Sequence, residues 1–423
     1  MRLTAAREHK PIYEVMKQLD TEILFDNFDA ALAFVLEKER IAMATDPMRQ
    51  KEPLVISPHD SSKPPLKIHP DVAYWNDADE KNFILTRLQS GRYSLKPNLR
   101  NRKFLFRGQT EFYDTCTPNL FRKEKARYTA DLIHGQEMML LALSHPMVRL
   151  LDNGINLLGY DFTFEMNLYG LNQHYYNKTS LLDLSSDTDV AGFFATNRYD
   201  SATDTYYPMT DENKIGVLYY YDIDSNSSFS FGGLSTIGLQ VFPRSGCQSG
   251  FLQNLGKGSN FNDNLRVKWV KFRHNADVSE HYSKMFVKGT ALFPDDILSQ
   301  HWRGRNSNII SDRTVILNMI MNEHRESKSK VIRELSERGF SIRKYIVEFI
   351  PDELHTYYED IKNGFWEEWC QRIHFNGDVN GKFKDAMIST VNNPTYAWAF
   401  EEGKNTNMPM NGFLSRMYAD CLM

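Results

Sequence analysis

Apolar residues recur at helical spacing in some segments of the chain and as short continuous runs in others, and these patterns predict its elements. Within 9–44 the spacing is helical, and Asn27 or Asp29 is placed to cap the helix. Residues 45–70 are rich in Pro, His, Ser and Lys, so we expect an extended connector there.

The segment KFLFRG at 103–108 is typical of a buried strand that ends at a glycine. Further strands are predicted at 179–186, 215–223, 267–272 and 344–350, and 224–236 is expected to be a polar loop. Helices are predicted at 124–151, 162–176, 187–199 with Asp187 or Thr188 as cap, 311–324, and 328–339 ending at Gly339, and Pro351 is placed to open one more.

Strands and helices mix without strict alternation, which indicates the α+β class. We expect a mixed, largely antiparallel sheet flanked by helices, with helical additions at both ends. The predicted division is an N-terminal helical and linker region at 1–94, a central domain at 95–362 and a C-terminal extension at 363–423.

Composition narrows the class of protein. The 423 residues are 41% hydrophobic and 25% charged, as in a globular protein, and their net charge of −4 argues against non-specific nucleic-acid binding by the whole molecule. The cysteines form no CxxC pair, and no apolar run approaches the ~18 residues needed to cross a bilayer. We therefore expect a cytoplasmic protein with reduced thiols and no membrane partner.

Several common catalytic motifs are missing from the sequence. It contains no GxxxxGK[ST], no HExxH and no GxSxG. The 12 histidines are scattered without the spacing of metal ligands, so no metal is expected.

Three constellations of polar residues remain. The first is FRGQ at 106–109 followed by TPNLFR at 117–122, the second is QHYYNKTSLLDLS at 173–185 followed by AGFFA at 191–195, and the third is Arg244 with QSGF at 248–251. Together they supply the candidate site residues, which are Arg107, Gly108, Gln109, His174, Tyr175, Thr179, Ser180, Asp183, Arg244 and Gln248.

At these residues the chain resembles the FRG domain family, named for its Phe-Arg-Gly signature. The family's Pro-x-Leu-Phe-Arg, QHYGxPTRLLDWT, Ala-x-x-Phe-Ala and Arg…Gln-x-Gly-Phe patterns are similar to the three constellations in order and spacing. Its closing Leu-x-x-x-Gly and Phe-x-Pro-Asp are similar to 334–340 and 349–353, so the resemblance covers about 95–362. The chain departs from the family pattern at Tyr176, Lys178, Ser180 and Leu184, and whatever the family's arginine at position 180 does cannot be carried over.

The order of the motifs is also similar to that of the ADP-ribosyltransferase superfamily. There a first strand ends in Arg or His, a second carries Ser, Thr or Tyr before a helix, and a third element supplies Glu or Gln. This resemblance implies a nucleotide or dinucleotide ligand, with NAD as co-substrate.

The same resemblance assigns roles to the candidate residues. Arg107 would bind the diphosphate or a ribose, and Gly108 would let the backbone approach the ligand. Gln248 would hydrogen-bond the nicotinamide ribose, and Tyr175 with the Thr179 and Ser180 hydroxyls would line the nicotinamide pocket. His174 joins Arg107, Tyr175 and Gln248 as catalytic candidates, and Gln109, Asp183 and Arg244 join the predicted binding residues.

Gln248 raises a chemical problem, because cleavage of the nicotinamide–ribose bond builds positive charge that a carboxylate stabilises better than an amide. Asp183 and Glu280 are the candidate carboxylates. Without one, the chain would be either a slow enzyme or a nucleotide or nucleic-acid sensor without turnover, for example in bacterial stress or phage defence. In a third interpretation Arg107 is structural and bridges loop carbonyls or pairs with Asp183.

Overall fold

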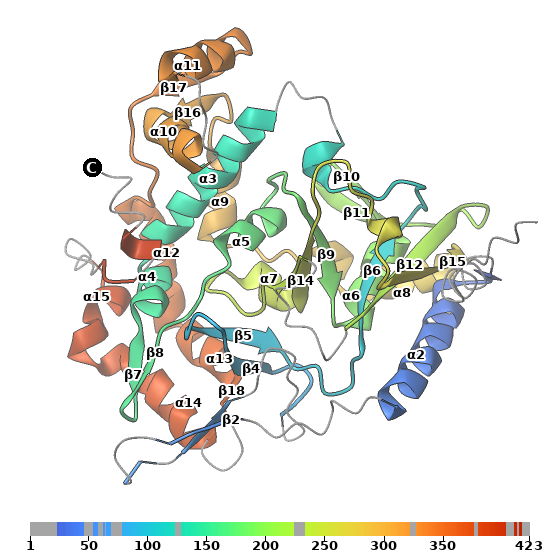
Figure 1. Cartoon of the computed structure of the whole chain (residues 1–423), viewed down its shortest axis with the longest axis horizontal. Coiled ribbons are helices and arrows are strands. Elements are labelled where there is room, and N and C mark those ends of the chain that lie inside the picture. Colours follow the sequence, from blue (N-terminus) through green and yellow to red (C-terminus); the bar gives the residue numbers. More distant parts are fainter. Residues whose placement is uncertain are drawn as a thin grey trace, which may run out of the picture.

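The computed structural model describes residues 23–45, 54–57, 62–63, 65–68, 78–122, 128–223, 233–321, 327–375, 380–402, 410–412 and 414–416. The fold is α+β, as predicted, and centres on a seven-stranded sheet with the strand order β1-β15-β12-β6-β9-β14-β13 (Figure 1). All neighbouring strands pair antiparallel except β1 and β15, which are parallel. Its strands are β1 (Leu24–Phe25), β6 (Phe104–Gln109), β9 (Leu181–Ser185), β12 (Ile215–Asp222), β13 (Leu234–Thr236), β14 (Gly250–Asn254) and β15 (Val267–Arg273).

Helices and short strands surround this sheet. The helices are α2 (Phe28–Ala44), α3 (Tyr128–Ser144), α4 (Pro146–Asn153), α5 (Leu168–His174), α6 (Thr188–Thr196), α7 (Pro243–Cys247), α8 (Ala276–Met285), α9 (Ile297–Gly304), α10 (Asp312–Met321), α11 (Lys328–Glu337), α12 (Pro351–Lys362), α13 (Phe365–Gln371), α14 (Asn380–Ile388) and α15 (Ala397–Phe400). The remaining strands are β2 (Leu54–Ile56), β3 (Leu66–Ile68), β4 (Phe83–Arg87), β5 (Tyr93–Pro97), β7 (Ile155–Leu157), β8 (Tyr160–Phe162), β10 (Asn197–Asp200), β11 (Thr205–Pro208), β16 (Ile309–Ser311), β17 (Ser341–Arg343) and β18 (Ile373–His374).

Strand β6 separates two hydrophobic layers because successive side chains of a strand point to opposite faces. Phe104 and Phe106 pack with α2, α6 and α8 on one face, and Leu105 packs with Tyr219 of β12 on the other. At the start of β6, the buried Glu39 of α2 accepts hydrogen bonds from the backbone N–H groups of Lys103 (2.6 Å) and Phe104 (2.8 Å). The N-terminal helix thus fixes the strand that carries Arg107.

A second, larger hydrophobic core lies among the helices that follow. It joins α3, α4 and α5 to α9 and to the C-terminal helices, which Figure 1 shows on the side of the molecule opposite α2. Strand β18 pairs in parallel with β4 at its edge, so 373–374 lie beside 83–84. The domain limits at 94 and 362 stay a prediction. No helix in the described part of the chain is both long and apolar enough to span a bilayer.

Local signals placed several elements correctly. The strand at 103–108 is β6, and α6 begins after Asp187, whose carboxylate accepts hydrogen bonds from the N–H groups of Asp189 and Val190. Asn27 caps α2 through its side chain, and Gly339, with φ of 89°, follows α11. The parts of the predictions at 9–22 and 224–232 lie outside the described residues.

Other predictions were wrong. The helix at 124–151 breaks into α3 and α4 because the residue before Pro146 is disfavoured in helical backbone, and His145 has ψ of 128°. The predicted helix at 162–176 is helical only over 168–174, and the N-terminal helical prediction includes a strand at 24–25. Within the expected connector, strand 54–56 pairs with strand 66–68. Within the expected loop, 234–236 is a strand.

The predicted strand at 344–350 is also wrong, although its burial alternates. Val347 and Phe349 are buried, but the N–H of Phe349 bonds to the Ser144 hydroxyl, 2.9 Å away, instead of a neighbouring strand. Strand β17 lies just before this segment, where it pairs with β16. The alternation of apolar residues therefore indicated a buried, extended segment, but this segment lacks the backbone hydrogen bonds to a neighbouring strand that define a β-strand.

His145 makes the stability of the fold depend on pH. Its Nδ1 accepts a hydrogen bond from the Met147 N–H at 3.2 Å, and burial lowers the pKa of its imidazole to about 3. Between that pKa and the ordinary value of about 6.5 the unfolded chain binds the proton and the folded chain does not. Below about pH 6 we expect the free energy of unfolding to fall by up to about 1.4 kcal/mol per pH unit from this group.

Denaturant unfolding at several pH values measures this slope. His145→Asn keeps an acceptor at the start of α4 and removes the titrating group, so the slope should become shallower in that variant. Identical slopes in the two proteins would show that His145 is not buried as described.

Candidate functional site

The central sheet parts between β6 and β9. Phe106 and Ser185 form the bridge between these two strands, whose residues are all described, and the pairing goes no further toward Arg107 and Asp183. Beyond the bridge Arg107 reaches across, and its Nη1 donates to the backbone carbonyl of Asp183 at 2.9 Å. The guanidinium satisfies a carbonyl that a continued ladder would have paired.

A cavity of about 460 Å³, here called the split-sheet cavity, opens at this gap, within the range of small-ligand sites. Its wall includes Arg107, Gly108 and Gln109 of β6, His174 of α5, Asp183 of β9 and Gln248 after α7, so six of the candidate residues meet there. The wall also includes Glu111, Tyr113, Arg122, Phe194, Arg198, Tyr199 and Tyr206.

Positive charge gathers in the split-sheet cavity. Besides Arg107 it contains Arg122, whose Nε donates to the Thr117 carbonyl at 2.8 Å, and Arg198 of β10. Burial lowers the pKa of Arg122, and the neighbouring charge of Arg107 lowers it further. The Nε of Arg107 is buried and has no hydrogen-bond partner among the described residues. Two guanidinium groups close enough to repel each other favour an anion between them.

His174 and Asp183 form the second polar feature of the cavity. The imidazole Nε2 lies 3.7 Å from Asp183 Oδ1, and neither atom has a hydrogen-bond partner among the described residues. Burial lowers the pKa of His174, against the opposing effects of Asp183 and of a hydrogen bond with Gln248. The imidazole is therefore neutral at neutral pH. The Asp183 side chain, 34% exposed, lines the cavity beside it.

Gln248 lines the cavity, but its side-chain amide already has hydrogen-bond partners within the protein. Its side chain is buried, its Nε2 donates to the Leu292 carbonyl at 3.0 Å, and it hydrogen-bonds His174. Its own backbone carbonyl accepts from the Ser185 hydroxyl at 2.7 Å. The predicted bond from Gln248 to a ribose would require these contacts to break.

Tyr175 and Arg244 are not in the cavity, contrary to the sequence prediction. Tyr175 is fully buried and donates through its hydroxyl to Asp296 Oδ2, and burial raises the pKa of its phenol well above the ordinary value. The Arg244 guanidinium lies 4.6 Å from the Tyr175 ring centroid and donates to the carbonyls of Pro294 (3.1 Å) and His174 (3.3 Å). Both residues hold the end of α5 in the core.

Thr179 and Ser180 also lie outside the cavity lining. The Thr179 hydroxyl donates to Gln173 Oε1, and Gln173 Nε2 donates to Asp183 Oδ2 at 2.9 Å, so Thr179 orients the carboxylate through a second side chain. Ser180 lies near the surface with Asn254, 2.7 Å away, and Tyr169.

Gly108 has a packing role that the sequence did not predict. Its backbone lines the cavity, but a Cβ on it would lie 2.0 Å from the Ala191 carbonyl oxygen of α6. The missing side chain therefore serves the packing of α6 on β6, and the predicted approach of a ligand to its backbone stays a prediction.

Sequence reasoning missed part of the cavity wall. Arg122 stands in the TPNLFR segment but was not assigned to the site, although an arginine at the end of a motif was an available signal. Arg198, Tyr199 and Tyr206 come from the β10–β11 hairpin, and nothing in their spacing marks them.

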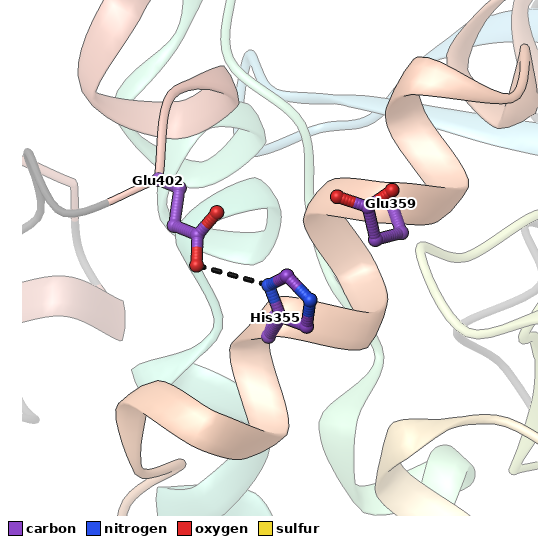
Figure 2. Close-up of side chains that lie close together, drawn as sticks. All are labelled: His355, Glu359 and Glu402. Carbon is purple, nitrogen blue, oxygen red and sulfur yellow. Dashed lines mark hydrogen bonds and ion pairs between the residues drawn. The ribbon is translucent and has the colours of Figure 1, made fainter.

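Outside the cavity, one group in the described part of the chain could share a metal ion. The donor atoms of His355, Glu359 and Glu402 lie within 4.8 Å of one another. Figure 2 shows His355 facing Glu402, with Nδ1 and Oε1 2.9 Å apart, and Glu359 further along α12. The hydrogen bond from Lys362 lowers the pKa of Glu359, and the side chains are half-exposed, so we regard the group as a surface charge network.

Comparison with family models finds that residues 102–204 match the FRG domain. The matched segment contains Arg107, Arg122, His174 and Asp183, and ends before Gln248. Comparisons with curated proteins and with solved structures gave no match. The FRG resemblance is thus supported over the segment that supplies most of the cavity wall.

Proposed function

We propose that the split-sheet cavity binds an anionic nucleotide or dinucleotide of the NAD type and cleaves it in the manner of an ADP-ribosyltransferase. The observation that carries this proposal is the pairing in one cavity of the Arg107 and Arg122 guanidinium groups with the Asp183 carboxylate. We further propose that the FRG domain extends past residue 204 toward 362, because β12, β14 and β15 complete the sheet around β6 and β9.

The arginines would hold the diphosphate. A guanidinium presents several N–H donors in a plane that suits phosphate oxygens, and a negative ligand would offset the repulsion that lowers the pKa of Arg122. The unpartnered Nε of Arg107 supplies one such donor, while its Nη1 stays on the Asp183 carbonyl.

The aromatic wall would hold a base or the nicotinamide ring. Tyr113, Phe194, Tyr199 and Tyr206 line the same cavity, and flat rings stack favourably on aromatic side chains. Tyr206 stacks in turn on Phe293, with ring planes 11° apart, which fixes its orientation.

Asp183 would supply the charge that Gln248 lacks. As the bond between the ribose C1′ and the nicotinamide nitrogen breaks, its electron pair leaves with nicotinamide and C1′ becomes positive. A carboxylate beside C1′ stabilises that charge, and a nucleophile, either water or an acceptor group, then forms the new bond to C1′. The other candidate, Glu280, is on α8 beside Lys284 and is not part of the cavity wall.

Binding without turnover is the second candidate function, and the position of Gln248 favours it. The Gln248 amide, at the place where the superfamily has Glu or Gln, is buried and already bonded to the Leu292 carbonyl and His174. Titration calorimetry with NAD, together with an assay for released nicotinamide, separates the two functions. Intact NAD recovered after long incubation indicates a sensor, and the absence of binding removes both candidates.

Arg107→Lys should weaken NAD binding by about 10- to 100-fold, since charge-assisted hydrogen bonds to a planar fork contribute about 1.5–3 kcal/mol. The melting temperature should change little, because a lysine can still donate to the Asp183 carbonyl. Arg273→Lys, at an exposed position outside the cavity, is the matched control. Unchanged NAD affinity together with a large loss of stability would assign Arg107 a purely structural role.

A further inference from the structure

A second cavity, of about 470 Å³, is lined in part by Pro243 and Cys247 of α7. It is enclosed by 239–243 and Cys247, by 294–297 at the start of α9, and by residues of α12 and α13. None of the residues that line the split-sheet cavity lines this one.

Aromatic rings form one wall of the second cavity. Phe242, Tyr357, Phe365 and Trp369 line it. The indole N–H of Trp369 donates to the Gln240 carbonyl at 2.9 Å, and the Tyr357 hydroxyl donates to the Ala399 carbonyl at 3.1 Å, so both rings are fixed in orientation. One face of Trp369 stacks on Trp366, with ring centroids 5.2 Å apart. Aromatic ring faces attract cations through their negative potential.

The charged groups of the second cavity are mostly carboxylates. Asp295 and Asp296 are already engaged, by Arg303 and by the N-terminus of α9. Asp360 and Glu368 line the cavity, are exposed, and form no ion pair among the described residues.

Arg372 and His145 are the two basic residues in the lining of the second cavity. Arg372 lines it but donates to the Gly246 carbonyl at 3.1 Å and lies over the Phe83 ring. His145, whose pKa is near 3, adds no positive charge at neutral pH. The four carboxylates in the lining outnumber the one guanidinium, so the net charge of the lining is negative and favours a cation.

Gln240 supplies an independent observation. Its side chain is 4% exposed, its Nε2 donates to the Ile237 carbonyl at 2.5 Å, and its Oε1 is buried without a hydrogen-bond partner among the described residues. A buried acceptor left unpaired is unfavourable, and a donor bound in the cavity would pair it.

We propose that the second cavity is a binding site for a small organic cation, an amine with an apolar or aromatic body. The ammonium N–H would donate to Gln240 Oε1 with its charge toward Asp360 and Glu368, and the body would pack on Phe242 and Trp369. This site goes beyond the proposed nucleotide function, and no step of that function depends on it.

Titration calorimetry of the full chain with three matched probes tests the proposal. Phenethylamine should bind with saturation at one site, at least about tenfold more tightly than the neutral phenethyl alcohol, and phenylacetate should bind least. Equal affinity for the amine and the alcohol would show that the cavity is an apolar pocket without selectivity for cations, and would overturn the proposal. The absence of saturable amine binding would overturn it as well.

A surface variant locates the bound amine. Asp360→Asn combined with Glu368→Gln alters only exposed side chains, and it should weaken phenethylamine binding by about 3- to 10-fold while leaving alcohol binding unchanged. Glu367→Gln, also exposed on α13 but outside the cavity lining, is the control. Equal affinities in the double variant and the control would show that the amine binds elsewhere.

Discussion

Gly108→Ala is expected to lower the free energy of unfolding by at least about 3 kcal/mol. The added methyl group would lie 2.0 Å from the Ala191 carbonyl oxygen and 2.5 Å from the Ala195 backbone nitrogen. Both are backbone atoms of α6, which cannot rotate away as a side chain could. The helix is itself buried between β6 and Tyr282 of α8, so relief requires the whole helix to move off the sheet.

Gly304→Ala is the matched control for this prediction. Gly304 is the last residue of α9, and a Cβ there would meet nothing within 4 Å. Alanine favours the helix by up to about 1 kcal/mol relative to glycine, so this variant should be neutral or slightly more stable. Denaturant unfolding followed by circular dichroism compares the two. Wild-type stability in Gly108→Ala would mean that α6 does not pack on β6 as described.

The same glycine shows what the sequence could predict and what it could not. The apolar run before Gly108 and the capping Asp187 are local signals, and β6 and α6 were placed correctly from them. Which neighbour a glycine accommodates is a matter of packing between segments some 80 residues apart, and no local pattern contains that information.

The candidate site, too, was predictable from local motifs in part only. His174 and Tyr175 are adjacent in the sequence, and consecutive residues at a helix end point in different directions, so only one of them could face the cavity. The motif order identified the strands that meet at the split, including Arg107 and Asp183. It could not identify Arg198 and Tyr199, because these reach the cavity only through the folding of the β10–β11 hairpin.

Arg107 illustrates how two interpretations of one residue can both hold. Its Nη1 bridges to a backbone carbonyl, as the structural interpretation expected, while its Nε remains unpartnered in the cavity wall. A guanidinium has enough donors for both tasks. The bond to Asp183 also ties the anchor of the proposed ligand to the strand that carries the proposed catalytic carboxylate.

Asp183→Asn is expected to lower the rate of nicotinamide release from NAD by about 10²- to 10³-fold. The amide keeps an oxygen for the Gln173 donor and the size of the side chain, but it removes the negative charge beside the breaking bond. The affinity for NAD should change by less than about threefold, or improve, because a charge that repels the diphosphate is removed. Such a fall in rate without loss of binding is what a carboxylate acting in the transition state predicts.

Glu280→Gln is the control for this experiment, since it removes the other candidate carboxylate from an exposed position on α8. Its rate should equal that of the wild-type chain. If Glu280→Gln were slow and Asp183→Asn were not, the bond would be broken at a site other than the split-sheet cavity. If both variants kept the wild-type rate, neither candidate carboxylate, on β9 or on α8, would act in the reaction. The positive charge on C1′ would then have to be stabilised by another group, such as the Glu111 carboxylate, which follows β6 and lines the cavity.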